Sequence, residues 1–213
     1  ENNSSDVSGN YRVTFVKNEN NVVVNAAKIT ISANDVTTTY GKEYTLTHDG
    51  VLFGSDTFTG SLEVENATSS ASGNLNAGTY AIGQGTLSAG KNYNITYDNG
   101  TLTVDKADLE ITVSDASKVY GEADPKIDFS TIGLVDGDTV TVTRDAGEAA
   151  GSYDIDNFNV SDNGSNYNVT FKSGKFTIEQ RNLSISIDDA EFTYNGAEQF
   201  ADKFTASGLV NGD

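Results

Sequence analysis

The stretch LEITVSDASKVYG at residues 109–121 opens with apolar residues at every second position and ends in a Tyr-Gly pair. Apolar and polar residues that alternate with period two predict a β-strand with one buried face. The chain contains two related stretches, ITISANDVTTTYG at 29–41 and LSISIDDAEFTYNG at 183–196. Their starting points lie 80 and 74 residues from that of the first stretch. This period predicts small domains in tandem, because the units of solenoid repeats are only about 20–50 residues long.

Two later landmarks follow each stretch in the same order. Gly-x-Tyr occurs at 78–80 and 151–153, and Asn-Tyr occurs at 92–93 and 166–167. The first full copy also carries a polar insertion near 66–72, which we expect to form a surface loop. The landmarks divide the chain into the last part of one repeat, two full repeats and the first part of another, at residues 1–27, 28–107, 108–181 and 182–213.

Composition excludes several functional classes. The net charge of -18, with 13 basic and 31 acidic residues, disfavours nucleic acid as a partner, because phosphates are neutralised by Lys and Arg. No stretch approaches the roughly 20 apolar residues that span a bilayer, so we expect no membrane insertion of this segment. The absence of cysteine excludes disulfides, thiol catalysis and cysteine metal sites. An apolar fraction of 36% with 21 glycines is typical of short strands and turns.

A hairpin is predicted near the end of each repeat, because Asn-Gly or Ser-Gly separates two alternating runs. The pattern covers residues 93–104 and 167–178, and residues 11–24 show it with a longer loop. The next repeat begins five residues after each hairpin, without a Gly/Ser-rich or Pro-rich linker. Short junctions of constant length predict a fixed angle between neighbours, and therefore an elongated, semi-rigid rod of domains placed end to end.

The hairpin over residues 11–24 needs further strands to cover its apolar face. We expect it to belong to a repeat whose opening strand is not in this chain. Its apolar residues would then be exposed, or covered by residues 182–213 of a neighbouring molecule. The alternative is a folded unit shifted in phase, with the hairpin packed on residues 28–60 of the same chain.

Six motifs of the second repeat together resemble the MBG domain of the YGX type, namely YGEADP (120–125), GLVDGD (133–138), RDAG (144–147), GSY (151–153), NYNVT (166–170) and GKFTI (174–178). The resemblance covers residues 108–179 and, with a longer loop, residues 28–105. Such domains occur in tandem in very large secreted or surface-attached bacterial proteins, most of them adhesin-like. The resemblance implies a mainly β module that is β-grasp-like, with an Ig-like sandwich as the alternative. It implies neither catalysis nor a cofactor.

The recurring tyrosines are candidates for a surface that stacks on glycans. They alternate with residues typical of a core, however, and tyrosine readily buries its ring while its hydroxyl bonds to the backbone. We therefore expect a structural role for Tyr40, Tyr80, Tyr93, Tyr120, Tyr153 and Tyr167. Positive φ or a close backbone approach is predicted at Gly41, Gly78, Gly121 and Gly151.

Acidic turns supply the hard oxygen ligands that calcium prefers. The candidate ligands are Asp136, Asp138, Asp154 and Asp156. No segment reproduces a 12-residue calcium loop with its terminal glutamate, so solvated turn carboxylates are the favoured interpretation. The single histidine, His48, has no cysteine to pair with and no histidine at the equivalent position of another repeat. We expect no catalytic site.

These patterns predict a non-catalytic repeat segment of a bacterial adhesin-like protein, located outside the cell. Its expected role is a spacer that presents other domains, and those other parts would contact host or cell-surface glycans or proteins. Two alternatives stay open. The repeats themselves could bind glycan or mucin weakly and multivalently, or they could form an extender that calcium stiffens.

Overall fold

The structure is a computed structural model that describes residues 24–200 and 203–212. These residues fold mainly as β-strands, and the only helix among them is the short 3-10 element η2 (Ser161–Gly164). The mainly β class predicted from the alternating runs is therefore confirmed. The hairpin predicted over residues 11–24 lies outside the described residues, apart from Val24.

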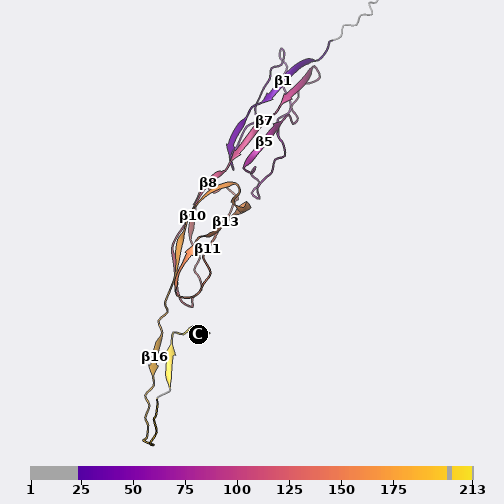
Figure 1. Ribbon diagram of the computed structural model, residues 1–213. Helices are drawn as coiled ribbons and strands as arrows, with labels where there is room; N and C mark the ends of the chain where they lie inside the picture. The colour runs from indigo at the N-terminus through magenta and orange to yellow at the C-terminus, as the bar shows by residue number, and fades with distance from the viewer. Residues whose placement is uncertain (1–23, 201–202, 213) are drawn as a thin grey trace, which may run out of the picture.

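The first full repeat divides its strands between two sheets. One sheet has the strand order β3-β1-β6, and the other has the order β2-β7-β5-β4. In Figure 1, β1, β5 and β7 belong to this repeat, and the second repeat begins at β8. The strands are β1 (Ala27–Ala33), β2 (Val36–Thr39), β3 (His48–Asp49), β4 (Glu63–Val64), β5 (Gly78–Gly83), β6 (Tyr93–Asp98) and β7 (Gly100–Asp105).

The second repeat shares the central strands of this plan, but among the described residues it has no counterpart of β4 and contains a separate strand pair. Its sheets have the strand orders β10-β8-β14 and β12-β15-β9, and β11 pairs with β13 beside them. The strands are β8 (Ala107–Val113), β9 (Ala116–Val119), β10 (Phe129–Ile132), β11 (Val140–Thr143), β12 (Gly151–Ile155), β13 (Asn157–Val160), β14 (Tyr167–Lys172) and β15 (Gly174–Glu179).

The chain passes from one sheet to the other at two places in each repeat. β6 pairs in parallel with β1, with Tyr93 opposite Ala27, whereas β7 pairs in parallel with β2, with Leu102 opposite Val36. β14 and β15 pair with β8 and β9 in the same way. The two halves of each predicted hairpin therefore lie in different sheets, and the hairpin predictions over 93–104 and 167–178 are wrong.

A close backbone approach explains the Gly that resembled a hairpin turn. Neither Asn99 nor Gly100 has the positive φ that a two-residue Asn-Gly turn requires. A Cβ on Gly100 would instead lie 2.7 Å from the carbonyl oxygen of Ala33, where the adjacent strand also changes sheet. The Asp35 carboxylate accepts the Thr101 backbone N–H at 2.8 Å and holds the two crossing points together. The glycine is needed for this contact and not for a turn.

The second repeat builds the same crossing with equivalent residues. A Cβ on Gly174 would lie 2.8 Å from the Ser114 carbonyl oxygen. The Asp115 carboxylate accepts the Lys175 backbone N–H at 2.7 Å. Because each crossing changes sheets at a fixed point, both sheets contribute to a single core.

The core of each repeat lies between its two sheets. In the second repeat, Leu109 and Ile111 of one sheet and Phe176 and Ile178 of the other belong to one buried cluster. Each such side chain contributes about 1.5–3 kcal/mol through burial. This arrangement corresponds to a two-sheet sandwich, and the described residues contain no α-helix packed on a sheet. Its parallel strand pairs differ from the antiparallel sheets of an immunoglobulin-like sandwich.

The last part of the chain forms one strand pair, with β16 (Ser184–Ile187) antiparallel to β17 (Phe204–Ser207). It corresponds to β8 and β10 of the second repeat, which pair in the same sense. No third strand covers this pair among the described residues. Its large apolar side chains are exposed: Leu183, Ile185, Ile187, Phe192, Tyr194, Phe200, Phe204 and Leu209.

Candidate functional site at the junction between repeats

Tyr40 connects the two full repeats. It directly follows β2, and its backbone N–H donates to the Asp105 carbonyl at 2.8 Å, which fixes it at the end of the first repeat. Its side chain is only 1% exposed. Its hydroxyl donates to Oδ2 of Asp138 in the second repeat at 2.9 Å. This hydrogen bond joins residues that lie 98 positions apart in the sequence.

Asp138 also accepts a hydrogen bond from the hydroxyl of Tyr167, the tyrosine of the second repeat's Asn-Tyr landmark. The Tyr167 hydroxyl in turn accepts the Val135 backbone N–H at 3.0 Å. The rings of Tyr40 and Tyr167 meet edge to face, with centroids 5.4 Å apart and an interplanar angle of 79°. One carboxylate and two tyrosines thus form the centre of the junction.

The junction holds the carboxylate in its charged form. Burial acts to raise the pKa of Asp138, but hydroxyl donors led by Tyr167 outweigh burial and lower that pKa below its ordinary value. Burial, together with the hydrogen bond to Asp138, raises the pKa of Tyr167. Both shifts favour one protonation pattern, in which neutral tyrosines donate to an ionised aspartate. Hydrogen bonds to a charged acceptor are stronger than neutral ones.

Asn166 makes a second set of contacts across the junction. Its Oδ1 accepts the Ala77 backbone N–H at 2.9 Å, and its Nδ2 donates to Oδ1 of Asn76 at 3.0 Å. The Asn166 side chain is buried, at 3% exposure. The backbone N–H of Ala71 donates to Oδ2 of Asp162 at 3.1 Å. The polar insertion near 66–72 is therefore not merely a surface loop, since it and its continuation pack against the second repeat.

Gly41 allows the repeats to approach closely. Its φ is +76°, and a Cβ at this position would lie 2.5 Å from Cγ1 of Val135. Gly121 repeats this contact with the last segment of the chain, where a Cβ would lie 2.3 Å from Cγ2 of Val210. The backbone N–H of Tyr120 also donates to the Glu179 carbonyl at 2.9 Å, as Tyr40 does to Asp105. The contacts of the Tyr-Gly pair are therefore present at both junctions, the one between the two full repeats and the one between the second repeat and the last segment.

The predicted tyrosines do not share one surface. Tyr40, Tyr93 and Tyr167 are buried, and the other three are partly buried. The hydroxyls of Tyr80 and Tyr153 donate to backbone carbonyls four residues earlier, those of Asn76 and Ala149. Tyr120 lies at the second junction.

Three of the four predicted glycines have positive φ, and the fourth, Gly151, does not. Gly41 and Gly121 combine positive φ with a close approach. Gly78 has a φ of +157° and only ordinary contacts. Gly151 has neither feature, since its φ is not positive and a Cβ added there would have no atom within 4 Å. The prediction for Gly151 is wrong because its place at the start of β12 requires only extended backbone.

The calcium candidates are not brought together. Asp136 and Asp156 are exposed, Asp138 accepts tyrosine hydroxyls, and Asp154 forms an ion pair with Lys175. Residues 24–200 and 203–212 contain no group of three or more acidic, histidine or cysteine side chains that could hold a metal ion.

His48 lies in β3 with its ring against Phe58, at a centroid distance of 4.7 Å and an interplanar angle of 82°. It contributes to packing in the sheet that contains β1.

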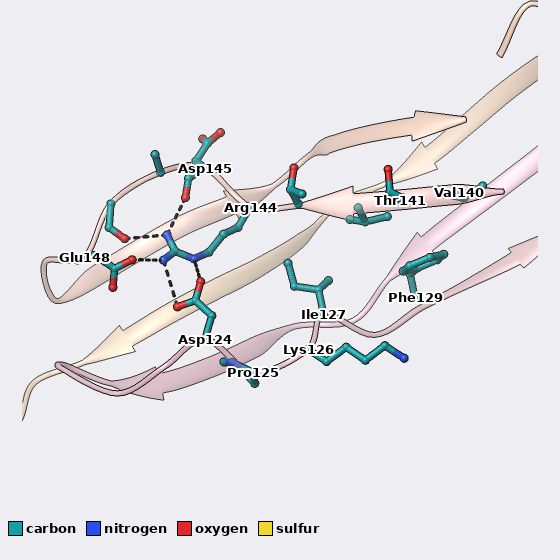
Figure 2. A pocket seen from close by; sticks show the side chains of 14 residues that line it. Asp124, Pro125, Lys126, Ile127, Phe129, Val140, Thr141, Arg144, Asp145 and Glu148 are labelled. Atoms are coloured by element: carbon teal, nitrogen blue, oxygen red, sulfur yellow. Dashed lines mark hydrogen bonds and ion pairs between the residues drawn. The ribbon is translucent and has the colours of Figure 1, made fainter. Parts of the chain in front are cut away.

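A network around Arg144 lies in the second repeat, beside a surface hollow of about 760 Å³. Figure 2 shows the guanidinium enclosed by Asp124, Glu148 and the turn that follows Arg144. Its five N–H groups donate to both Asp124 oxygens (2.7 and 3.2 Å), to Glu148 (2.6 Å) and to the carbonyls of Asp145 and Gly147 (2.7 Å each). No donor is left for an external anion, so this arginine closes a loop and does not form a ligand site.

The network also pairs a buried lysine. Lys118 is 7% exposed, and its Nζ lies 2.6 Å from Oδ1 of Asp124 and also contacts Glu148. Hydrogen bonds from Arg144 and then Lys118 lower the pKa of Asp124 to about 2. The guanidinium lies 4.6 Å from the ring centroid of Phe176 in the core. Sequence reasoning missed this network, although the motif RDAG at 144–147 was visible in the sequence.

Sequence reasoning also missed the roles of Asp138, Val135 and Asn166 in the junction. A signal was present, because Gly133–Asp138 has a counterpart at 208–213 and a weaker one at 50–56. Each of the three comes after the Tyr-Gly or Tyr-Asn-Gly landmark of its own repeat.

Comparison with known families gives one result. The family described as MBG domain (YGX type) matches residues 29–103 and 109–177, which together make up more than half of the chain. No curated protein and no solved structure matches the chain. Within the described residues, no helix has the length and apolar character needed to cross a membrane.

Proposed function

The chain belongs to the MBG domain (YGX type) family, and from this premise we propose that it is a spacer segment of a secreted or surface-attached bacterial adhesin-like protein. The family is not a known enzyme family. In this proposal the repeats form a semi-rigid rod that holds other domains away from the cell surface. The single observation that carries the proposal is the hydrogen bond from Tyr40 to Asp138 across the junction.

A spacer must resist bending, and the junction supplies the contacts for this. Tyr40 and Asp138 are both buried, so solvent does not compete for their hydrogen bond. The second contact, between Ala77 and Asn166, joins a different pair of residues across the same junction. Two hydrogen-bonded contacts restrict rotation more than either one alone. The repetition of the Gly41 contact at Gly121 supports one angle at successive junctions.

Spin labels can test this stiffness. The chain has no cysteine, so Lys91→Cys and Ser173→Cys introduce unique attachment points at exposed residues, one in each repeat. A narrow distribution of label-to-label distances is expected. The substitution Tyr40→Phe removes the junction hydroxyl and should broaden this distribution. A broad distribution in the chain without Tyr40→Phe would contradict the spacer function.

Tyr153→Phe is the matched control for this measurement. It also removes one tyrosine hydroxyl, but that hydroxyl donates to the Ala149 carbonyl within the second repeat at 2.8 Å. The distance distribution should therefore remain as narrow as in the labelled chain without either substitution. Equal broadening by Tyr40→Phe and Tyr153→Phe would assign the effect to general loosening of the repeat.

A further inference from the structure

The first repeat carries a group of residues at the end opposite its junction with the second repeat, which we call the Asp56 face (Phe53, Asp56, Asn92 and Tyr93). The hydroxyl of Tyr93 donates to Oδ2 of Asp56 at 2.7 Å and accepts the Phe53 backbone N–H at 2.9 Å. The Asp56 backbone N–H donates to the Phe53 carbonyl at 3.2 Å, which closes a turn. The rings of Phe53 and Tyr93 stack with centroids 6.2 Å apart.

The second repeat has the same arrangement where it receives Tyr40. Tyr167 donates to Asp138 and accepts the Val135 backbone N–H at 3.0 Å. The Asp138 backbone N–H donates to the Val135 carbonyl at 3.1 Å. The carbonyl of Asn166 accepts the first backbone N–H of the opening strand at 3.0 Å, and the carbonyl of Asn92 does so in the first repeat at 2.9 Å. The two faces therefore match bond for bond.

The two faces differ in what covers them. In the second repeat, Asp138 and Asn166 are buried beneath the first repeat, at 9% and 3% exposure. On the Asp56 face, Asp56 and Asn92 are exposed, and Phe53 is 69% exposed. The described residues provide no hydrogen bond to the Asn92 side chain, whereas Asn166 makes two. An exposed aromatic ring beside an aspartate that accepts a single tyrosine is an incomplete copy of the junction.

We propose that the Asp56 face is a docking surface for the Tyr-Gly turn of a further repeat of this family. The incoming tyrosine donates its hydroxyl to Asp56, as Tyr40 does to Asp138. The incoming glycine faces Phe53, which occupies the place of Val135. This inference rests on the proposed spacer function and identifies the partner of its open end.

The chemistry of the face selects this partner. Asp56 is an acceptor positioned beside an aromatic ring, so it suits a hydroxyl on an aromatic side chain, which can pack against Tyr93 at the same time. Phe53 is larger than Val135, so it leaves even less room for a side chain on the residue opposite it, and glycine is the residue that fits. Each repeat offers a Tyr-Gly turn at one end and an acceptor face at the other. Because the two surfaces differ, each added repeat presents one of them free again, and further repeats can extend the array in the same sense.

A lengthened chain can test the docking. Joining residues 1–104 directly to residues 25–213 places a copy of the first repeat before the first repeat and preserves the five-residue step. The chain has no tryptophan, so Phe53→Trp in the second copy alone reports the environment of the Asp56 face. Compared with Phe53→Trp in the original chain, emission should shift to shorter wavelength and quenching by acrylamide should decrease. Unchanged emission and quenching would overturn the proposal.

Two glycine variants show whether the Tyr-Gly turn is the contact. Gly41→Ala in the first copy adds a methyl group where the turn must approach position 53 of the second copy. It should return emission and quenching toward those of the original chain with Phe53→Trp. Gly90→Ala in the first copy places alanine at nearly the same φ, +79° against +76°, where no atom lies within 4 Å of the new Cβ. It should leave the tryptophan protected. Protection that survives Gly41→Ala would mean docking through another surface and would overturn the assignment. These outcomes are independent of the label distances across the Tyr40–Asp138 junction, so the two proposals can fail separately.

Discussion

The substitution Gly41→Ala isolates the close contact between the two full repeats. Two costs add at this position. Alanine at φ +76° carries the steric penalty of the left-handed region, about 1–2 kcal/mol. The new Cβ would also lie 2.5 and 2.7 Å from the two methyl carbons of Val135, closer than real Cβ contacts. Such overpacking costs about 1–3 kcal/mol more.

Val135 has little freedom to move aside. Its side chain is β-branched and therefore stiff at χ1, and its backbone N–H is bound to the Tyr167 hydroxyl at 3.0 Å. The clash is relieved only if the repeats separate, which stretches the hydrogen bond from Tyr40 to Asp138. Gly41→Ala should consequently lower the free energy of unfolding and loosen the junction together.

Gly90→Ala is the matched control in the same repeat. Its φ of +79° imposes the same conformational penalty, and nothing lies within 4 Å of its Cβ position. Urea unfolding followed by far-ultraviolet circular dichroism should therefore show an additional loss of about 1–3 kcal/mol for Gly41→Ala over Gly90→Ala. Each 1 kcal/mol corresponds to about 4–8 °C in Tm for a unit of 60–100 residues. Equal losses for Gly41→Ala and Gly90→Ala would refute the reasoning. The double variant Gly41→Ala/Val135→Ala removes the clashing methyl groups and should recover part of the additional loss.

Three further outcomes are expected. Arg144 lowers the pKa of Asp124 to about 2. The ionised Asp124 therefore stabilises the fold above its unfolded pKa of about 3.9, and this contribution is lost as the pH falls toward about 2. Asp124→Asn should reduce the slope of stability against pH between about pH 4 and 2, measured as the unfolding midpoint in acid titrations. Phe176→Ala should destabilise the second repeat by about 3–5 kcal/mol in urea unfolding, because its ring is 0% exposed. Calcium should raise the Tm no more than magnesium does, because Asp138 accepts tyrosine hydroxyls and Asp154 pairs with Lys175. If calcium alone raised the Tm and a chelator reversed the increase, the calcium-stiffened extender would again be the better interpretation.

Local patterns predicted the strands well because a strand with one buried face needs only alternation along the chain. The run from Leu109 to Val113 is part of β8 in the structure, with Leu109, Ile111 and Val113 buried. The hairpin turn predicted from the Asn-Gly at 99–100 was wrong for a related reason. A glycine required for close approach and a glycine required for a turn look alike in sequence, and only the position of Ala33 distinguishes them.

The candidate site was less accessible to sequence reasoning. In the sequence, Asp138 is an acidic turn residue whose oxygens match the ligand type that calcium takes. Its two tyrosine donors, Tyr40 and Tyr167, lie 98 and 29 positions away, so no local spacing connects them. The repeated motifs indicated this connection only in part. Gly133–Asp138 recurs at 208–213, but the recurrence does not show which tyrosines bind the aspartate.

The sequence by itself determined the tandem repetition, the β character of the repeats and their family, because each of these follows from periodicity and from motifs inside one repeat. Only the tertiary structure decided which strands pair, since pairing depends on residues far apart in the chain. The tertiary structure likewise decided that the recurring Tyr-Gly pair faces a neighbouring repeat. At Gly41 this role depends on Val135. The absence of a side chain at Gly41 matters only because the fold brings Gly41 and Val135 within contact distance.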